Sequence, residues 1–210
     1  MVSPQAQIWE RYAAKYTPRR AVNAAGASTW LNWTQYPDHG PDETVLGNVR
    51  GKRALELGSG AGANLAHLAT LGAVCTGIDI APSRADLASD TWGHLGGLEF
   101  VTADAVDYLS SAGPVFDVVY SIFGAVWFTD PAILFPLVRA RLSVGGVFAF
   151  SQLPAVEQGD QAGQVIRQWH LPVDQWIEQL AAAGFGEIVA ETVGAPEPGR
   201  PGTVLVRARV

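Results

Sequence analysis

A short apolar segment that runs directly into a glycine-rich turn constrains the fold of this chain most strongly. Residues 53–57 read RALEL and residues 58–62 read GSGAG, and residues 65–72 (LAHLATLG) continue as a helix. Glycine adopts a positive φ without strain and lets the backbone approach a ligand closely. The free N–H groups at the start of a helix suit a carboxylate or a phosphate. The segment therefore predicts a strand–turn–helix unit that binds a small molecule.

The rest of the chain alternates between strand and helix patterns. After residues 53–57, the sequence predicts further strands over the following ranges: 74–80, 98–102, 115–122 and 147–151. It predicts helices between or after them over 82–90, 131–142 and 173–183. Two β-rich runs, 186–193 and 203–209, close the chain with a Pro- and Gly-rich connection that is typical of a hairpin. Alternation of this kind predicts an α/β fold with a mostly parallel sheet.

The first 50 residues follow a different pattern. Residues 4–16 have the spacing of an amphipathic helix, and residues 17–50 are irregular apart from a short helix near 42–47. Three of the seven tryptophans, Trp9, Trp30 and Trp33, fall in this part.

Composition excludes several classes of protein. The chain has 210 residues, which predicts one domain, and its 14 basic against 20 acidic side chains argue against nucleic-acid binding. A single cysteine excludes a disulfide framework, and the four histidines lack the spacing of metal ligands, so we expect no metal. There is no signal-peptide pattern and no apolar run long enough to span a membrane. We expect a cytoplasmic protein, a monomer or a homodimer, with a small molecule as its partner.

Acidic residues at the ends of the first three strands indicate what the glycine turn binds. Asp79 ends the second strand, where a carboxylate can accept hydrogen bonds from both hydroxyls of a ribose. Glu56 precedes the glycines, where it would repel a pyrophosphate and attract an ammonium group. Asp104 follows the third strand and can accept from an adenine amino group. The glycine spacing also departs from the dinucleotide fingerprint, which disfavours a nicotinamide cofactor without excluding it.

Five segments in this order resemble the successive motifs of class I S-adenosylmethionine-dependent methyltransferases, most closely the small-molecule branch called type 11. They are ALELGSGAG, GIDIAPS, TADA, FDVVYSIFGAVWF and LSVGGVFAF. The resemblance covers roughly residues 50–210. It implies a Rossmann-like, seven-stranded, mostly parallel sheet with an antiparallel last strand and helices on both faces. It also implies an N-terminal helical cover, residues 1–50, as part of the same domain as the cofactor-binding residues 51–210.

The resemblance implies S-adenosylmethionine as cofactor and assigns it a set of contacts on the loops after the strands and in the cover: Tyr16, Glu56, Gly58, Ser59, Gly60, Asp79, Ile80, Asp104, Ala105 and Ser121. Glu56 faces the ammonium group, Asp79 the ribose and Asp104 the adenine. Tyr12 is an alternative to Tyr16 as the aromatic residue of the cover.

The acceptor side is less defined. The family motif Asn/Asp-Pro-Pro-aromatic is absent after the fourth strand, which disfavours a nucleic-acid base or a protein amide as acceptor. We expect a substrate pocket with aromatic walls, although its members also suit an ordinary core: Trp33, Phe123, Trp127 and Trp169. His39 and His170 are the candidate catalytic bases, with structural roles as the alternative.

These observations predict methyl transfer from S-adenosylmethionine to O, N or C of a small, aromatic or hydrophobic molecule. The alternatives are a regulatory subunit that binds the cofactor without turnover and, further off, a nicotinamide-dependent oxidoreductase.

Overall fold

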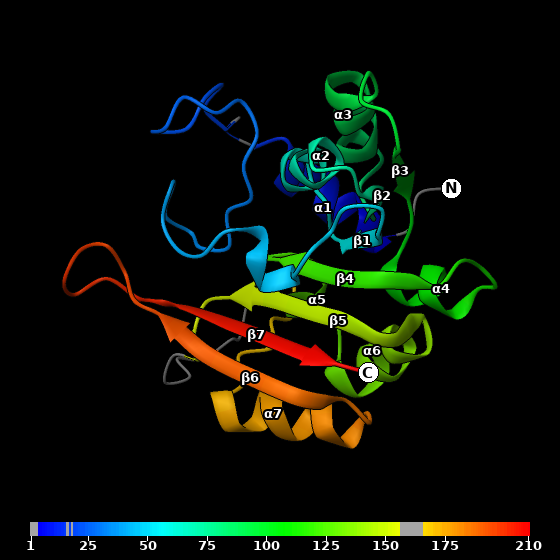
Figure 1. Cartoon of the computed structure of the whole chain (residues 1–210), viewed down its shortest axis with the longest axis vertical. Helices are drawn as coiled ribbons and strands as arrows, with labels where there is room; N and C mark the ends of the chain where they lie inside the picture. Colours follow the sequence, from blue (N-terminus) through cyan, green and yellow to red (C-terminus); the bar gives the residue numbers. More distant parts are fainter. Residues whose placement is uncertain (1–3, 16, 18, 156–165) are drawn as a thin grey trace.

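The computed structural model describes residues 4–15, 17, 19–155 and 166–210. Its centre is one seven-stranded sheet with the order β3-β2-β1-β4-β5-β7-β6 (Figure 1). The strands are β1 (Arg53–Leu57), β2 (Val74–Asp79), β3 (Leu98–Thr102), β4 (Phe116–Ile122), β5 (Leu142–Gln152), β6 (Gly186–Val193) and β7 (Thr203–Arg209). Strands β1 to β5 pair in parallel, and β7 runs antiparallel to both β5 and β6. The predicted fold class is therefore confirmed, including the antiparallel last strand.

Helices cover both faces of the sheet. They are α1 (Pro4–Ala13), the 3₁₀ helix η1 (Glu43–Leu46), α2 (Ala63–Thr70), α3 (Pro82–Trp92), α4 (Ala105–Ser110), α5 (Ala125–Phe128), α6 (Pro131–Ala140) and α7 (Val173–Ala182). One apolar cluster joins the sheet to α4, α6 and α7, with Phe135 and Trp176 fully buried at its centre. A second cluster joins the other face to α2 and η1, with Trp33 and Tyr120 at its centre.

Two helices and part of a strand were not predicted. Helix α4 has only six residues, and the preceding residue Asp104 caps it by accepting from the N–H groups of Val106 and Asp107. Helix α5 has four residues, too few for a periodic pattern to be visible. Strand β5 is longer than predicted because residues from Leu142 onward pair with β4 beyond a register shift. Strand pairing extends β5 and a side-chain cap begins α4, and neither leaves a hydrophobic period in the sequence.

The segment between α1 and β1 follows the surface of the sheet. The side chains of Gln35 and Tyr36 donate hydrogen bonds to the carbonyl of Pro201, in the connection between β6 and β7. Further along, the imidazole of His67 on α2 contacts Glu43 in η1 at 3.1 Å. Residues 35–36 therefore pack on the connection between β6 and β7, and η1 packs on α2.

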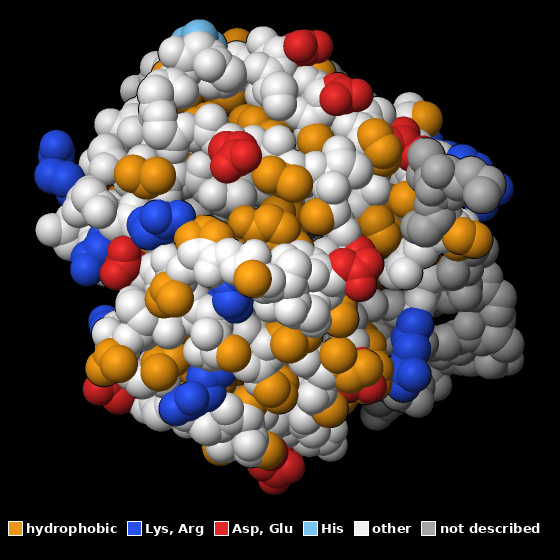
Figure 2. Space-filling view, turned by 90° about the vertical axis from the view of Figure 1, so that its right-hand side faces the viewer, with side chains coloured by type: hydrophobic (Ala, Val, Ile, Leu, Met, Phe, Trp, Pro, Cys, Tyr) orange, Lys and Arg blue, Asp and Glu red, His pale blue; other side chains and the backbone are white. Residues whose placement is uncertain are grey.

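The surface is mixed in character. On the face that Figure 2 shows, basic, acidic and apolar side chains are interspersed, with no continuous basic patch. Within the described ranges, no helix is long and apolar enough to cross a membrane.

Candidate cofactor-binding and active site

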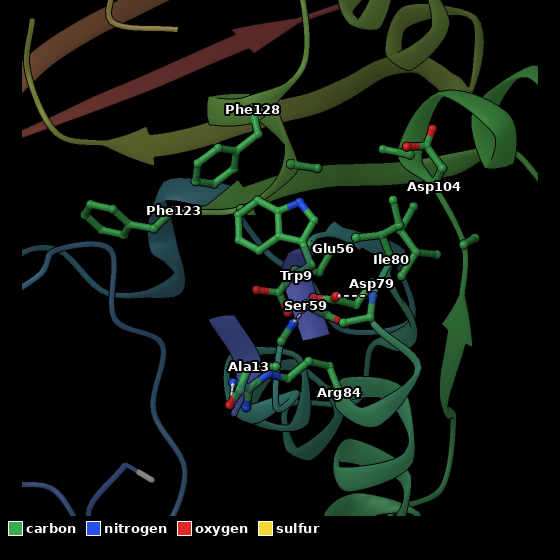
Figure 3. A pocket seen from close by; sticks show the side chains of 18 of the residues that line it. Trp9, Ala13, Glu56, Ser59, Asp79, Ile80, Arg84, Asp104, Phe123 and Phe128 are labelled. Atoms are coloured by element: carbon green, nitrogen blue, oxygen red, sulfur yellow. Dashed lines mark hydrogen bonds between the residues drawn. The ribbon is translucent and has the colours of Figure 1, made fainter. Parts of the chain in front are cut away.

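A cavity of about 280 Å³ opens at the carboxyl ends of the first four strands. It is lined by the loops after β1, β2, β3 and β4 and is covered by α1 (Figure 3). Chain direction around the sheet diverges between β1 and β4, and in open α/β sheets ligands bind at such a switch point. The fold therefore brings together the residues that the sequence predicted from separate motifs.

The glycines of the first loop have different tasks. Gly58 has a φ of +79°, and a Cβ there would lie 2.6 Å from the backbone nitrogen of Ala125. Gly62 has a φ of +76° and packs so closely on Phe100 that a Cβ would lie 2.4 Å from its ring. Gly60 also has a positive φ, but a Cβ there would meet no protein atom within 4 Å. Gly58 and Gly62 thus serve packing, whereas Gly60 leaves room at the cavity wall.

Glu56 on β1 is a buried carboxylate at the base of this cavity. It is 1% exposed, and burial raises its pKa from 4.5 to about 8. Its Oε1 accepts from the side-chain amide of Asn64 at 3.4 Å, and its Oε2 has no hydrogen-bond partner within the described residues. A buried acid with an unused oxygen fits a cationic ligand group, because pairing would offset the cost of ionising it.

Asp79 at the end of β2 organises the glycine loop. Its Oδ2 accepts from the backbone N–H of Gly60 and its Oδ1 from that of Ala81, both at 2.9 Å. Burial raises the pKa of this carboxyl group, and the two backbone hydrogen bonds oppose the rise. Each oxygen keeps a further lone pair for a ligand hydroxyl.

Asp104, Ile80 and Ala105, which the sequence assigns to cofactor binding, form the next part of the cavity wall. The Oδ1 of Asp104 caps α4, accepting from Val106 at 2.8 Å and from Asp107 at 3.2 Å. These bonds leave Oδ2 for a ligand donor. Figure 3 shows Asp104 and Ile80 toward one end of the cavity and Phe123 and Phe128 toward the other.

Ser59 lines the cavity, whereas Ser121 lies beneath it. The hydroxyl of Ser121 is buried, donates to the carbonyl of Leu57 at 2.7 Å and accepts from Val126 at 3.3 Å. It therefore ties the end of β4 to the start of the glycine loop.

Helix α1 closes the cavity from above. Trp9 points from it toward Phe128, with ring centroids 4.6 Å apart (Figure 3). The carboxylate of Glu10 accepts from the backbone N–H of Ser83 at 2.9 Å, and the guanidinium of Arg84 donates to the carbonyl of Ala13 at 2.7 Å. Helices α1 and α3 thus each satisfy a backbone group at the other's end.

The sequence predicted an aromatic cofactor contact at Tyr16, with Tyr12 as the alternative. Tyr12 lines the cavity, and Tyr16 lies outside the described residues. The sequence placed Trp9 in the cover without naming it as a site residue, and it missed Asn64 and Arg84 as cavity residues. The approach of all three to the cavity depends on how α1, α2 and α3 pack.

The aromatic residues after β4 divide into two layers. Phe123 and Phe128 line the cavity, and Phe123 has a φ of +48°, an uncommon conformation for a bulky residue. Trp127, Trp169 and His170 lie behind them and are absent from the lining. The carbonyl of Trp127 accepts from the backbone N–H of Trp169 at 2.8 Å, and the ring centroids of Trp127 and His170 are 5.3 Å apart.

Two more predicted residues lie elsewhere. His39 contacts the carbonyl of Gly194 at 2.7 Å through Nε2, beside the connection between β6 and β7. Trp33 is fully buried against Tyr120, and its indole donates to the carbonyl of Asp42. Neither lines the cavity. Across the described residues, no group of three or more His, Cys, Asp or Glu side chains could hold a metal ion.

Sheet order and site together define the class of protein: a Rossmann-like methyltransferase fold with a cofactor cleft at the carboxyl ends of its strands. Residues 55–150 match the family described as "Methyltransferase domain", of type 11. Residues 55–150 therefore carry the match to a class I S-adenosylmethionine-dependent methyltransferase domain, which confirms the resemblance seen in the motifs.

Solved structures support this assignment. An S-adenosylmethionine-dependent methyltransferase from Mesorhizobium loti is similar with a TM-score of 0.67 and 25% identity, covering 80% of this chain and 95% of that one. The structure of DhpI with S-adenosylhomocysteine has a TM-score of 0.61 and 26% identity, covering 78% of each chain. No curated protein matches the sequence.

A third structure shares the fold alone. The 1,6-didemethyltoxoflavin-N1-methyltransferase of Burkholderia thailandensis, with S-adenosylhomocysteine bound, is 23% identical with a TM-score of 0.60, covering 76% of this chain and 71% of that one. The cofactor of this class is S-adenosylmethionine, as predicted. The residues present here fit this cofactor. The unpaired oxygen of Glu56 suits its ammonium group, and the open space at Gly60 suits the rest of its amino-acid part.

Proposed function

We propose that this protein transfers the methyl group of S-adenosylmethionine to an O, N or C atom of a small apolar or aromatic acceptor. The observation that carries the proposal is the division of the cavity into an acidic part, with Glu56, Asp79 and Asp104, and an aromatic part. The acidic part offers acceptors for the three kinds of hydrogen-bond donor in S-adenosylmethionine, which are its ammonium group, its ribose hydroxyls and its adenine amino group. The aromatic part matches a flat apolar partner.

In this proposal each acidic residue binds a different donor. Glu56 holds the ammonium group, Asp79 the ribose hydroxyls, and Asp104 the adenine amino group through its Oδ2. Ile80 packs on the adenine face, and the loop at Gly60 approaches the amino-acid part. The bound cofactor supplies an electrophilic methyl group, and the residues of this chain orient it and exclude water.

The acceptor would lie between the covering helix and the loop after β4. Trp9, Phe123 and Phe128 form apolar walls there, with the hydroxyl of Thr129 as a nearby polar group. Because neither His39 nor His170 lines the cavity, the proposal relies on positioning and desolvation rather than on a histidine base. Burial lowers the pKa of His170, which supports a neutral imidazole that packs behind Trp127.

Binding and turnover test the proposal in sequence. Calorimetry with S-adenosylmethionine and S-adenosylhomocysteine is expected to show one site for each. Incubation with phenols, amines and indoles is expected to release S-adenosylhomocysteine faster than in the absence of an acceptor. Absence of binding to both cofactor forms would contradict the assignment.

The lack of a histidine in the cavity lining also fits the second candidate, a regulatory subunit that binds the cofactor without turnover. Binding without acceptor-dependent product, in the native protein as in Asp104→Ala, would favour this candidate. Binding of NAD(H) in place of S-adenosylmethionine would favour the oxidoreductase.

The acceptor part has its own test. Phe128→Ala removes a wall that packs on Trp9 and is expected to lower acceptor turnover at least tenfold while changing cofactor affinity less than about threefold. Equal losses in both would contradict a specific role in acceptor binding.

A further inference from the structure

The cofactor cleft is connected to the N-terminal segment by a short chain of hydrogen bonds. The guanidinium of Arg19 donates from Nη2 to Oδ1 of Asn64 at 2.8 Å, and Nδ2 of Asn64 donates to Oε1 of Glu56 at 3.4 Å. We call this the Arg19–Asn64–Glu56 relay. It joins three elements that are far apart in sequence: the N-terminal segment, α2 and β1.

The orientation of the Asn64 amide is fixed by chemistry. Its Oδ1 faces the Arg19 guanidinium and also accepts from the backbone N–H of Asn32 at 3.3 Å. Both neighbours are donors only, so the oxygen must face them and the NH₂ group must face Glu56. A rotated amide would place NH₂ against two donors.

Arg19 is itself held in place by Trp30. Its Nη1 donates to the carbonyl of Trp30 at 2.9 Å, and the guanidinium lies 4.8 Å from the centroid of the Trp30 ring. Trp30 is 8% exposed, so this support is part of the packed structure. The positive charge of Arg19 is thereby fixed on the side of Asn64 away from the cavity.

The relay acts on a carboxylate whose surroundings oppose its charge. Burial raises the pKa of Glu56, and Asp79 on β2 adds to the rise. Cys75 on β2 and Tyr120 on β4 also face the Glu56 carboxyl group. The side chain of Tyr120 lowers the pKa of Glu56. Asn64 and the charge of Arg19 lower the pKa as well. The relay thus favours the ionised form, in which the unpaired Oε2 can bind a cation.

We propose that Asn64 and Arg19 are positioning residues for the ammonium group of the cofactor, acting through Glu56, so that Arg19, in the segment after α1, contributes to cofactor binding without lining the cavity. The inference rests on the proposed function, in which Glu56 holds that group. It concerns the amino-acid part of the ligand alone, because the relay ends at Glu56 and has no contact with Asp104 at the adenine end.

Two ligands that differ only in the amino-acid part separate this role from a structural one. S-adenosylhomocysteine carries the ammonium group, and 5′-methylthioadenosine lacks the amino-acid part. In calorimetry at pH 7.5, Arg19→Gln and Asn64→Leu are each expected to weaken S-adenosylhomocysteine binding about tenfold, the size of one hydrogen bond to a charged group. Binding of 5′-methylthioadenosine is expected to stay within about twofold.

A neighbouring residue gives the matched control. Arg20 carries the same charge but pairs with Asp38 on the surface, where its side chain is 58% exposed. Arg20→Gln is expected to leave both affinities unchanged. The inference would be overturned if the Arg19 and Asn64 variants bound both ligands with equally reduced affinity, or if their affinity for both ligands were unchanged.

A second measurement needs no ligand. The carboxyl resonance of Glu56, assigned with Glu56→Gln, is expected to titrate at higher pH in Arg19→Gln and Asn64→Leu than in the native protein or in Arg20→Gln. The same midpoint in all four would overturn the inference. If the native protein bound neither ligand, the proposed function would fail, and this titration would still decide whether the relay acts on Glu56.

Discussion

Burial of the Glu56 carboxyl group raises its pKa, so its ionised form is favoured when a cation pairs with it. With its pKa raised to about 8, the residue stabilises the fold fully below pH 4.5, and that contribution is lost as the pH rises through 8. The cofactor-free protein therefore carries a cost that grows from pH 4.5 and is complete above pH 8, and an ammonium ligand would offset it.

Replacing Glu56 by Gln removes this cost while keeping the shape of the side chain. Glu56→Gln is expected to gain stability relative to the native protein between pH 5 and pH 8.5, by on the order of a few kcal/mol. Urea unfolding of the cofactor-free proteins across this range measures the difference, with Glu178→Gln, at an exposed position of α7, as the control. Parallel stability curves for Glu56→Gln and the native protein would contradict the buried charge.

Asp79 has two tasks at once, since it holds the glycine loop and faces the proposed ribose position. Asp79→Ala is expected to weaken S-adenosylhomocysteine binding by about 1–3 kcal/mol, because the loop loses its acceptors and the ligand hydroxyls are left unpaired. Calorimetry measures this loss, and Asp86→Ala on the exposed side of α3 serves as the matched control. Unchanged affinity in Asp79→Ala would reject the assignment.

At the scale of elements, α1 is a helix that packs on α3 with half of its ten residues exposed. Its ten residues include one buried side chain, Ala6, and its polar contacts with α3 involve Glu10 and Arg84. Helix α3 has no side-chain cap of its own at Ala81, so Glu10 satisfies an N–H group that would otherwise lack a partner in its first turn. An element held in this way opens more easily than the sheet beneath it.

Removal of the Glu10 contact tests the docking of α1. Glu10→Ala is expected to cost about 1 kcal/mol, the usual value of a helix cap, and to speed amide exchange in residues 4–13 about fivefold. Hydrogen exchange followed by mass spectrometry measures the effect, with Arg11→Gln on the exposed side of α1 as the control. Faster exchange in the control to the same extent would indicate general fraying instead.

On the scale of the whole molecule, the loops after β1, β2, β3 and β4 and helix α1 together form the cleft. A ligand bound there is therefore expected to stabilise the entire fold. S-adenosylhomocysteine at 100 times its Kd is expected to add about 2.7 kcal/mol of stability, which raises the Tm by about 5–10 °C for a chain of this size. Thermal unfolding with and without the ligand measures the shift. The same concentration is expected to move the Tm of Asp79→Ala much less, and an equal shift would contradict binding at this cleft.

The sequence was most informative about the site residues that lie at or just after the ends of the parallel strands. Glu56, Gly58, Asp79 and Asp104 each stand at a fixed distance from the end of a parallel strand, and the carboxyl ends of such strands meet at one edge of a sheet. Their assembly into one cavity therefore follows once the strands are recognised. The alternation of strand and helix patterns predicted the mostly parallel sheet, and the resemblance to the family implied its antiparallel last strand.

Only the tertiary structure decided what surrounds that row of residues. His39 and Trp33 were expected over the acceptor, but their segment packs on the hairpin connection at Gly194 and on Tyr120. Trp9 lines the cavity because α1 docks against α3, and Arg19 contacts Asn64 behind the cavity because the chain after α1 packs on α2. A periodic pattern can predict a helix, but it does not predict where that helix docks. Local sequence determines a strand and the loop that follows it, whereas the direction of a covering segment depends on side-chain contacts with distant parts of the chain.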